Sequence, residues 1–218
     1  MQKIRSVLQT CELIPLINLD HITISGMTLS EASDYVESSL GVNLQDGGSH
    51  QRYGTHNRLL RLEEGVYLEV IAIDPKKKKP PYPRWFNLDN FVGKPRITNW
   101  VCSSQNIEDA FGSFFFEGLE IVKMRRNQLK WLMALPKNGV LPFDGAHPLL
   151  LEWKTTPPAL RLLPSGCYLK QITIFHPDYV KLREKLKNFN DHRVSFAFND
   201  GVKFHMEIST PNGVRSME

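Results

Sequence analysis

The chain has 218 residues, of which 41% are hydrophobic and 23% are charged. It is therefore long enough to bury a core and has the composition of an ordinary globular protein. The formal net charge is +4, and the lysine run 76–79 alone supplies that many positive charges. Nothing basic remains beyond this run, which argues against nucleic acid as a partner.

Cysteine usage and hydropathy favour a cytoplasmic location. The three cysteines, Cys11, Cys102 and Cys167, lie far apart with no CxxC pair, so we expect no disulfide framework. No segment approaches the ~18 apolar residues of a membrane span. Polar residues interrupt the first sixteen residues, so we expect neither a signal peptide nor contact with a membrane.

A repeated pattern of elements runs along the chain. Three apolar segments with strand character resemble one another, at residues 19–24, 97–102 and 169–174. Each is followed by apolar residues at helical spacing. After each helical stretch come segments that alternate like strands, at 55–62 and 66–73, at 128–135 and 149–154, and at 194–198 and 202–209. The repeated order predicts βαβββ units.

These units predict an α+β fold, in which repeated βαβββ units form curved mixed sheets with helices on the outer face. The first unit covers residues 17–75. The second covers 95–156 and is expected to pair with the first, and a third, shorter βαβββ-like unit covers 165–210. Residues 76–94, rich in proline and lysine, are expected to form an extended, solvated connection.

Each unit ends on a strand with a glutamate among apolar residues: Glu69, Glu152 and Glu207. A carboxylate is costly to bury unless it is paired, protonated or bound to a metal. By alternation, His21 shares a face of the first strand with Leu19 and Thr23. If the sheet curls, His21 and Glu69 both point into its concavity.

Together these features resemble the vicinal oxygen chelate superfamily and, more narrowly, its glyoxalase-like domain family. The matching residues include Leu19-Asp20-His21, residues 47–50, 54–57 and 67–72, Trp85, Trp131 and residues 150–153. The resemblance implies a divalent metal ion (Fe, Mn, Ni or Zn) inside a U-shaped sheet made by two units. It places the metal ligands at His21, Glu69 and Glu152, with Asn99 at the fourth position.

Asparagine is a poor ligand for a transition metal, so Asn99 is expected to contact substrate or a bound water. Three protein ligands would leave positions open for substrate, and Glu69 or Glu152 could leave the metal and act as the catalytic base. The resemblance marks Asn57 as a substrate contact. His50, in a loop rich in glycine, and His56 are further candidates for substrate binding.

Structural explanations remain open for the same residues. His21 could bond to a neighbouring strand, and Glu69 and Glu152 could pair with an arginine. The pair Arg125-Arg126 could contact an anionic substrate, although a solvated turn is the favoured interpretation.

The sequence favours a metal-dependent enzyme acting on a small oxygen-chelating substrate by isomerase, lyase or dioxygenase chemistry. The alternative is a metal-free module that binds or sequesters a small molecule in the same cleft. Asn99 and Gln171, which stand where ligands are expected, favour the alternative. The unpaired third unit either packs against the other two or pairs with its copy in a homodimer.

Overall fold

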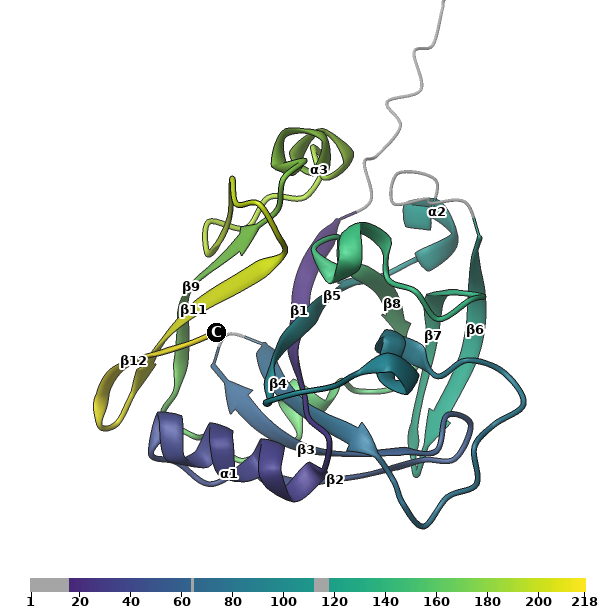
Figure 1. Ribbon diagram of the computed structural model, residues 1–218, viewed down its shortest axis with the longest axis horizontal. Helices are drawn as coiled ribbons and strands as arrows, with labels where there is room; N and C mark the ends of the chain where they lie inside the picture. Colours follow the sequence, from purple (N-terminus) through teal and green to yellow (C-terminus); the bar gives the residue numbers. More distant parts are fainter. Residues whose placement is uncertain (1–15, 64, 112–117) are drawn as a thin grey trace, which may run out of the picture.

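The computed structural model describes residues 16–63, 65–111 and 118–218. They form an eight-stranded sheet of order β2-β3-β4-β1-β5-β8-β7-β6 and a four-stranded sheet of order β10-β9-β11-β12 (Figure 1). None of the described helices is long and apolar enough to cross a membrane. Cys102 and Cys167 are free thiols, and Cys11 lies outside the described residues.

The first half of the large sheet is one βαβββ unit. Its elements are β1 (Ile17–Ser25), α1 (Leu29–Leu40), β2 (Gln45–His50), β3 (Thr55–Leu62) and β4 (Val66–Ile73). The Oγ1 atom of Thr28 caps α1 by accepting a hydrogen bond from the Glu31 amide at 3.1 Å. Gly41, at φ 68°, ends the helix in the left-handed conformation that glycine adopts readily.

The second half repeats this order. Its elements are β5 (Arg96–Ser104), α2 (Ile107–Phe111), β6 (Leu119–Arg126), β7 (Leu129–Pro136) and β8 (Leu149–Trp153). In each half the first strand pairs in parallel with the last, β1 with β4 and β5 with β8, and the halves join through the antiparallel pairing of β1 with β5. The predicted curved mixed sheet of βαβββ units is confirmed.

The two faces of the large sheet are buried against different partners. The outer face packs on α1, α2 and the small sheet, and it includes Ile22, Ile24, Leu68, Val70, Trp100, Cys102 and Leu150. This arrangement confirms the prediction that the helices lie on the outer face. The inner face forms a separate apolar cluster that includes Ile71, Val101, Trp131, Met133, Leu149 and Leu151.

The last part of the chain forms the small sheet. Its elements are β9 (Tyr168–Phe175), α3 (Tyr179–Lys185), β10 (Val194–Ala197), β11 (Lys203–Thr210) and β12 (Gly213–Met217). Here the first strand, β9, lies between β10 and β11, whereas β1 lies between β4 and β5. The similar sequences of β1 and β9 therefore do not give them the same place in a sheet, and β12 lies beyond the predicted end of the third unit.

The structure corrects the predicted face of β1. The register of β1 against β5 shifts between Leu19 and His21, so Asp20 is an extra residue on β1. As a result Leu19 packs in the outer core with Ile22, while His21 lines the inner cavity. Simple alternation puts Leu19 and His21 on one face, and the extra residue of a β-bulge breaks that alternation.

The connection 76–94 also differs from the extended, solvated segment that its composition suggests. It contains the 3₁₀ segment η1 (Trp85–Asn90), in which Trp85, Phe86 and Leu88 are buried. The buried Arg84 anchors this segment, because its Nε donates to the Tyr53 carbonyl at 3.0 Å and its Nη1 to Asp89 at 2.5 Å. Two further 3₁₀ segments are η2 (Pro142–Gly145) and η3 (Pro158–Leu160).

Trp100 tests the packing of the small sheet on the large one. Its side chain is fully buried, its indole N–H donates to the Ala146 carbonyl at 2.8 Å, and its ring centroid lies 5.2 Å from that of Phe189. We expect Trp100→Ala to lower the free energy of unfolding by about 3–5 kcal/mol, measured by urea denaturation. The control Tyr168→Ala removes a half-exposed ring of β9 and should cost less than about 1 kcal/mol. Equal losses would contradict the described packing.

Candidate functional site

A buried imidazole between two carboxyl groups is the centre of the site. The bulge on β1 turns Asp20 and His21 toward the same space, and His21 Nδ1 donates to Asp20 Oδ1 at 2.7 Å. On the neighbouring strand β4, Glu69 Oε2 lies 3.5 Å from His21 Nε2. The ring of His21 stacks on that of Tyr67, with centroids 4.7 Å apart. All four side chains are buried, so this charged group is shielded from solvent.

Asn57 connects Glu69 to a second charged group. Its Nδ2 donates to Glu69 Oε1 at 2.5 Å, and its Oδ1 accepts from Arg126 Nη1 at 2.7 Å and from the Gly48 amide at 2.9 Å. A carboxylate only accepts and a guanidinium only donates, so these contacts fix the orientation of the amide. Asn57 therefore bridges the buried Glu69 carboxylate and the buried Arg126 guanidinium through hydrogen bonds.

Arg126 reaches the site from the opposite edge of the sheet. It ends β6, which with β2 forms the two edges of the eight-stranded order, and the curl of the sheet brings these edges into contact. Two glycines of β2 leave room for this contact. A Cβ atom on Gly48 would meet Arg126 Cδ at 3.2 Å, and one on Gly47 would meet Asn57 Oδ1 at 2.1 Å.

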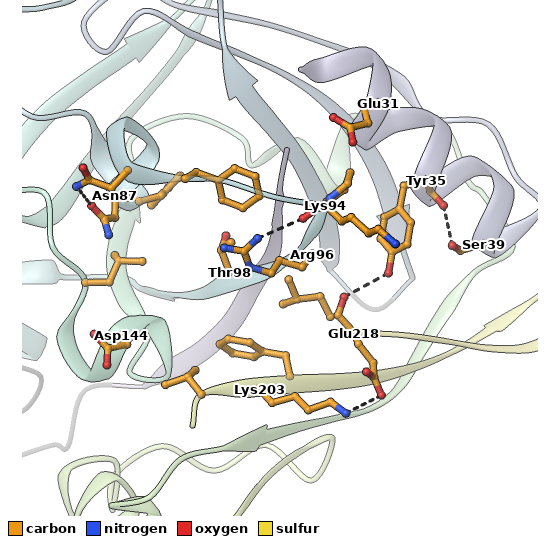
Figure 2. A pocket seen from close by; sticks show the side chains of 18 of the residues that line it. Glu31, Tyr35, Ser39, Asn87, Lys94, Arg96, Thr98, Asp144, Lys203 and Glu218 are labelled. Carbon is orange, nitrogen blue, oxygen red and sulfur yellow. Dashed lines mark hydrogen bonds and ion pairs between the residues drawn. The ribbon is translucent and has the colours of Figure 1, made fainter. Parts of the chain in front are cut away.

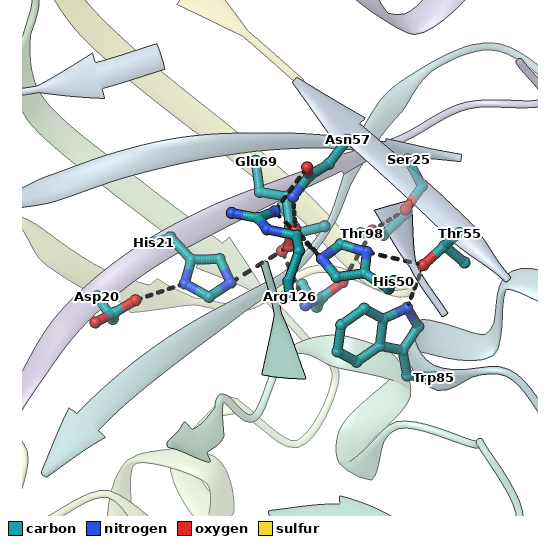
Figure 3. Close-up of polar contacts among 12 residues, drawn as sticks. Asp20, His21, Ser25, His50, Thr55, Asn57, Glu69, Trp85, Thr98 and Arg126 are labelled. Carbon is teal, nitrogen blue, oxygen red and sulfur yellow. Dashed lines mark hydrogen bonds and ion pairs between the residues drawn. The ribbon is translucent and has the colours of Figure 1, made fainter. Parts of the chain in front are cut away.

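His50 is held in one neutral tautomer. Its Nε2 lies 3.3 Å from Arg126 Nη1, which can only donate, so Nε2 must carry the lone pair. The proton is then on Nδ1, which lies 3.0 Å from Thr55 Oγ1. Trp85 Nε1 donates to the same oxygen at 3.2 Å. Figure 3 shows how these contacts converge on Glu69 and Arg126.

The electrostatics of the three ionisable groups agree with this geometry. Burial disfavours the charge on His21, but hydrogen bonds and charge from Asp20 and Glu69 outweigh it and raise the pKa of His21 to about 9. Burial also opposes ionisation of Glu69, yet its contacts with His21 lower its pKa to about 2. Burial lowers the pKa of His50 to about 3, and the positive charge of Arg126 acts in the same direction.

The cavity beside these groups is small and has two different walls. Its volume is about 20 Å³, enough for roughly one water molecule. The first half of the sheet supplies a polar wall of His21, His50 and Glu69, to which Arg126 is added from β6. The other wall is apolar and aromatic, and it comprises Trp85, Phe86, Trp131, Met133, Leu151 and Trp153.

The structure does not bring together the predicted metal ligands. His21 and Glu69 meet, but Glu152 points to the outer face of β8, where its Oε2 accepts from the amide of Ile107 at 3.1 Å and its Oε1 pairs with Lys154. The residues of β8 that face the cavity side are Leu149 and Leu151. No group of three His, Cys, Asp or Glu side chains within the described ranges could hold a metal ion.

Arg126 further opposes a metal at this place. A divalent ion shared by His50 and Glu69 would bind the Nε2 lone pair of His50, and Arg126 Nη1 takes that lone pair. A guanidinium so near would also repel the ion. The donor set and its geometry therefore do not fit the metal that the family resemblance implies.

Two other predicted residues lie away from the cavity. Asn99 is fully buried, and its Nδ2 donates to Thr23 Oγ1 at 3.2 Å, so it links β5 to β1. His56 alternates with the inward Asn57 on β3 and borders a separate surface groove with Asp46 and Asp74. The predicted substrate contacts at His50 and Asn57 do lie in the polar cluster, and His50 lines the cavity.

The sequence favoured a solvated turn for Arg126 over a contact with an anionic substrate, and it assigned no role to the aromatic wall. The pair Arg125-Arg126 suggests a solvated turn, and Arg125 is indeed exposed, but Arg126 is only 7% exposed. Alternation along β6 was the signal available, because Val122, Met124 and Arg126 share one face. Trp131 and Trp153 face each other across neighbouring strands, with ring centroids 5.4 Å apart.

A larger groove of about 1090 Å³ lies between α1, the start of β5 and β11 (Figure 2). The charged residues that line it are all exposed. Lys203 Nζ lies 3.0 Å from Glu218 Oε1, Tyr35 donates to the Glu218 carbonyl at 3.3 Å, and Arg96 donates to the Val92 carbonyl at 3.0 Å. The groove thus offers no buried charge in need of a partner.

Comparisons with known proteins agree with the fold. The sequence matches the profile of the glyoxalase-like domain family over residues 19–189, whereas no curated protein matches it. A hypothetical protein from Staphylococcus aureus is similar over 93% of this chain and 99% of its own, with 13% identity and a TM-score of 0.59. At this identity the likeness concerns the fold alone.

Weaker structural likenesses extend over about two thirds of the chain. Methylmalonyl-CoA epimerase from Mycobacterium tuberculosis covers 66% of this chain and 92% of its own, with 16% identity and a TM-score of 0.44. An epimerase variant from Streptomyces coelicolor, in complex with 2-nitronate-propionyl-CoA, covers 62% and 95%, with 10% identity and a TM-score of 0.42.

The raised pKa of His21 predicts a pH dependence of stability. Its pKa is about 9 in the folded chain and 6.5 in its ordinary state. The stabilisation is therefore complete below pH 6.5 and is lost as the pH rises through 9. We expect a loss of roughly 3 kcal/mol over this range in the wild type and a flatter profile in His21→Gln, measured by urea denaturation at each pH.

His192→Gln provides the matched control, because His192 is an exposed residue between α3 and β10. It should keep the wild-type profile. Parallel curves for the wild type and His21→Gln between pH 6.5 and 9 would show that the buried ion pairs of His21 do not stabilise the fold.

Proposed function

The chain belongs to the glyoxalase-like domain family, and we propose that its concave cleft binds a small organic molecule without a metal ion. The observation that carries this proposal is the contact of Arg126 Nη1 with His50 Nε2 and Asn57 Oδ1, at 3.3 and 2.7 Å. The guanidinium of Arg126 thus occupies the lone pair of His50 that a metal ion would need as a ligand.

Binding is favoured over acid–base catalysis by the protonation states of the site. A general acid or base works best when its pKa is near the operating pH. The pKa values of His21, His50 and Glu69 are about 9, 3 and 2, so none of the three is poised to exchange a proton near neutral pH. Catalytic roles for Glu69 and Glu152 stay predictions from the family resemblance, and the outward position of Glu152 does not favour them.

The two walls of the cavity indicate the kind of molecule that would bind. Ligand sites are commonly apolar surfaces with a few polar groups that set orientation and specificity. Here Trp131, Trp153 and Met133 supply the apolar surface, and the polar groups lie opposite, on β1, β2 and β4 and at the end of β6. A compact molecule with an apolar body and oxygen atoms at one end fits this division.

The metal-dependent enzyme predicted from the sequence would need a metal ion to bind its substrate, whereas the proposed binding module would not. We expect protein purified without a histidine tag to bind apolar, oxygen-bearing fragments in the presence of EDTA. Adding Mn²⁺, Ni²⁺ or Zn²⁺ should leave their affinity unchanged within about two-fold, since His50 and Glu69 are engaged by protein groups. Ligand-observed NMR measures the binding, and calorimetry measures any uptake of metal.

Two variants identify the site of any metal that does bind. One equivalent of metal that is lost in Glu69→Ala and kept in Glu152→Ala, together with fragment binding that requires it, would contradict the proposal. Metal bound equally by the wild type and Glu69→Ala would lie elsewhere and leave the proposal intact.

A further inference from the structure

Arg126 is a buried cation without a carboxylate beside it. Its side chain is 7% exposed, and none of the described Asp or Glu oxygens lies within ion-pair distance of it. Its two hydrogen-bond partners, Asn57 and His50, are neutral groups. Glu69 is joined to Arg126 through Asn57 and interacts with it through its charge, but the two form no direct ion pair. A buried guanidinium is costly unless its N–H groups are hydrogen-bonded, so any N–H that lacks a protein partner is a candidate contact for a ligand.

The geometry of the guanidinium defines where that anion would sit. Both protein contacts use Nη1, which has two N–H bonds, one toward Asn57 and one toward His50. The Nε–Nη2 edge, with its two parallel N–H bonds, has no partner in the described part of the chain. Neither atom is among the fully buried polar atoms that lack a hydrogen bond, so both retain accessible surface. This edge is the one that binds a carboxylate in bidentate fashion.

We propose that Arg126 is the receptor for the carboxylate of a ligand whose apolar body packs against Trp131 and Trp153. This inference rests on the proposed function of the cleft as a binding site. The ligand class is a small monocarboxylate with a flat or compact apolar body. A single negative charge is the most that the cluster favours, because Asp20 and Glu69 together already balance the charges of His21 and Arg126.

A ligand of this kind has to displace one wall, since the cavity now has room for roughly one water molecule. Trp85 and Phe86 belong to η1, which comes from the connection between the two halves. The strand walls are held by ladders of hydrogen bonds, such as those of β7 with β6 and β8. Moving Trp85 and Phe86 would break no strand ladder, but it would cost the hydrogen bond of Trp85 Nε1 to Thr55 Oγ1 and the stacking of Trp85 on Tyr53.

Fluorine NMR with a matched pair of probes tests the assignment. Trifluoromethylbenzoate and its neutral amide share one apolar ring and differ at the group that Arg126 would contact. We expect the wild type to bind the acid at least about ten-fold more tightly than the amide, because a bidentate charge-assisted pair is stronger than neutral hydrogen bonds. The same preference should appear when naphthoate and its amide, which have a larger ring, compete with the fluorinated acid for the site.

Two substitutions on one strand localise the effect. Arg126→Met keeps an apolar stem and removes the guanidinium, so the preference for the acid should disappear. Arg125→Met changes the exposed neighbour and should retain the preference. Arg126→Lys keeps the charge without the bidentate edge and should give an intermediate ratio. Thermal unfolding confirms that each variant folds, and the ratio of acid to amide in the wild type needs no variant.

The outcomes separate this inference from the proposed function. Equal binding of acid and amide by the wild type, or an unchanged preference in Arg126→Met, would overturn the carboxylate assignment while the cleft remained a binding site. Binding of neither member of either pair, with no fragment bound in EDTA, would overturn both.

Discussion

The antiparallel pairing of β1 with β5 is the contact on which the rest of the structure depends. It joins two βαβββ units into one sheet that curls until its edges, β2 and β6, meet. The bulge at Asp20 lies in this pairing, and it turns Asp20 and His21 toward the interior together. The same pairing places Trp100 on the outer face, where the small sheet packs. The site and the small sheet are thus both positioned by one pair of strands.

The two halves of the sheet have the same topology but different interiors. The first half places a histidine and a glutamate on its inner face, and the second places Leu149 and Leu151 at the inward positions of its last strand. Among the described inward residues of β6, β7 and β8, the charged one is Arg126, which reaches the first half and contacts His50 and Asn57. The two units therefore do not contribute matching metal ligands. The first supplies the polar wall of the cavity, and the second supplies apolar residues and Arg126.

Much of the fold could be predicted from the sequence, and less of the site. The bounds expected for two strands, 55–62 and 66–73, are those of β3 and β4, because alternation and the turn between them are unambiguous there. The nearness of His21 and Glu69 also follows from their strands. The orientation of Glu152 could not be predicted in this way, because both faces of the five-residue strand β8 carry apolar residues and either face could point inward. Alternation along β6 indicates that Arg126 is buried, but its partners could not be predicted, because they lie on a distant sheet edge that meets β6 only after the sheet curls.

The central claim is that an arginine of the chain, and not a metal ion, lies among His50, Asn57 and Glu69. A crystal structure of the wild type soaked in zinc chloride, with anomalous data collected at the zinc edge, tests this claim most directly. The account predicts Arg126 Nη1 within hydrogen-bond distance of His50 Nε2 and Asn57 Oδ1, and no anomalous peak beside Glu69. A peak bound to His21, His50 or Glu69, with Arg126 turned away, would contradict it.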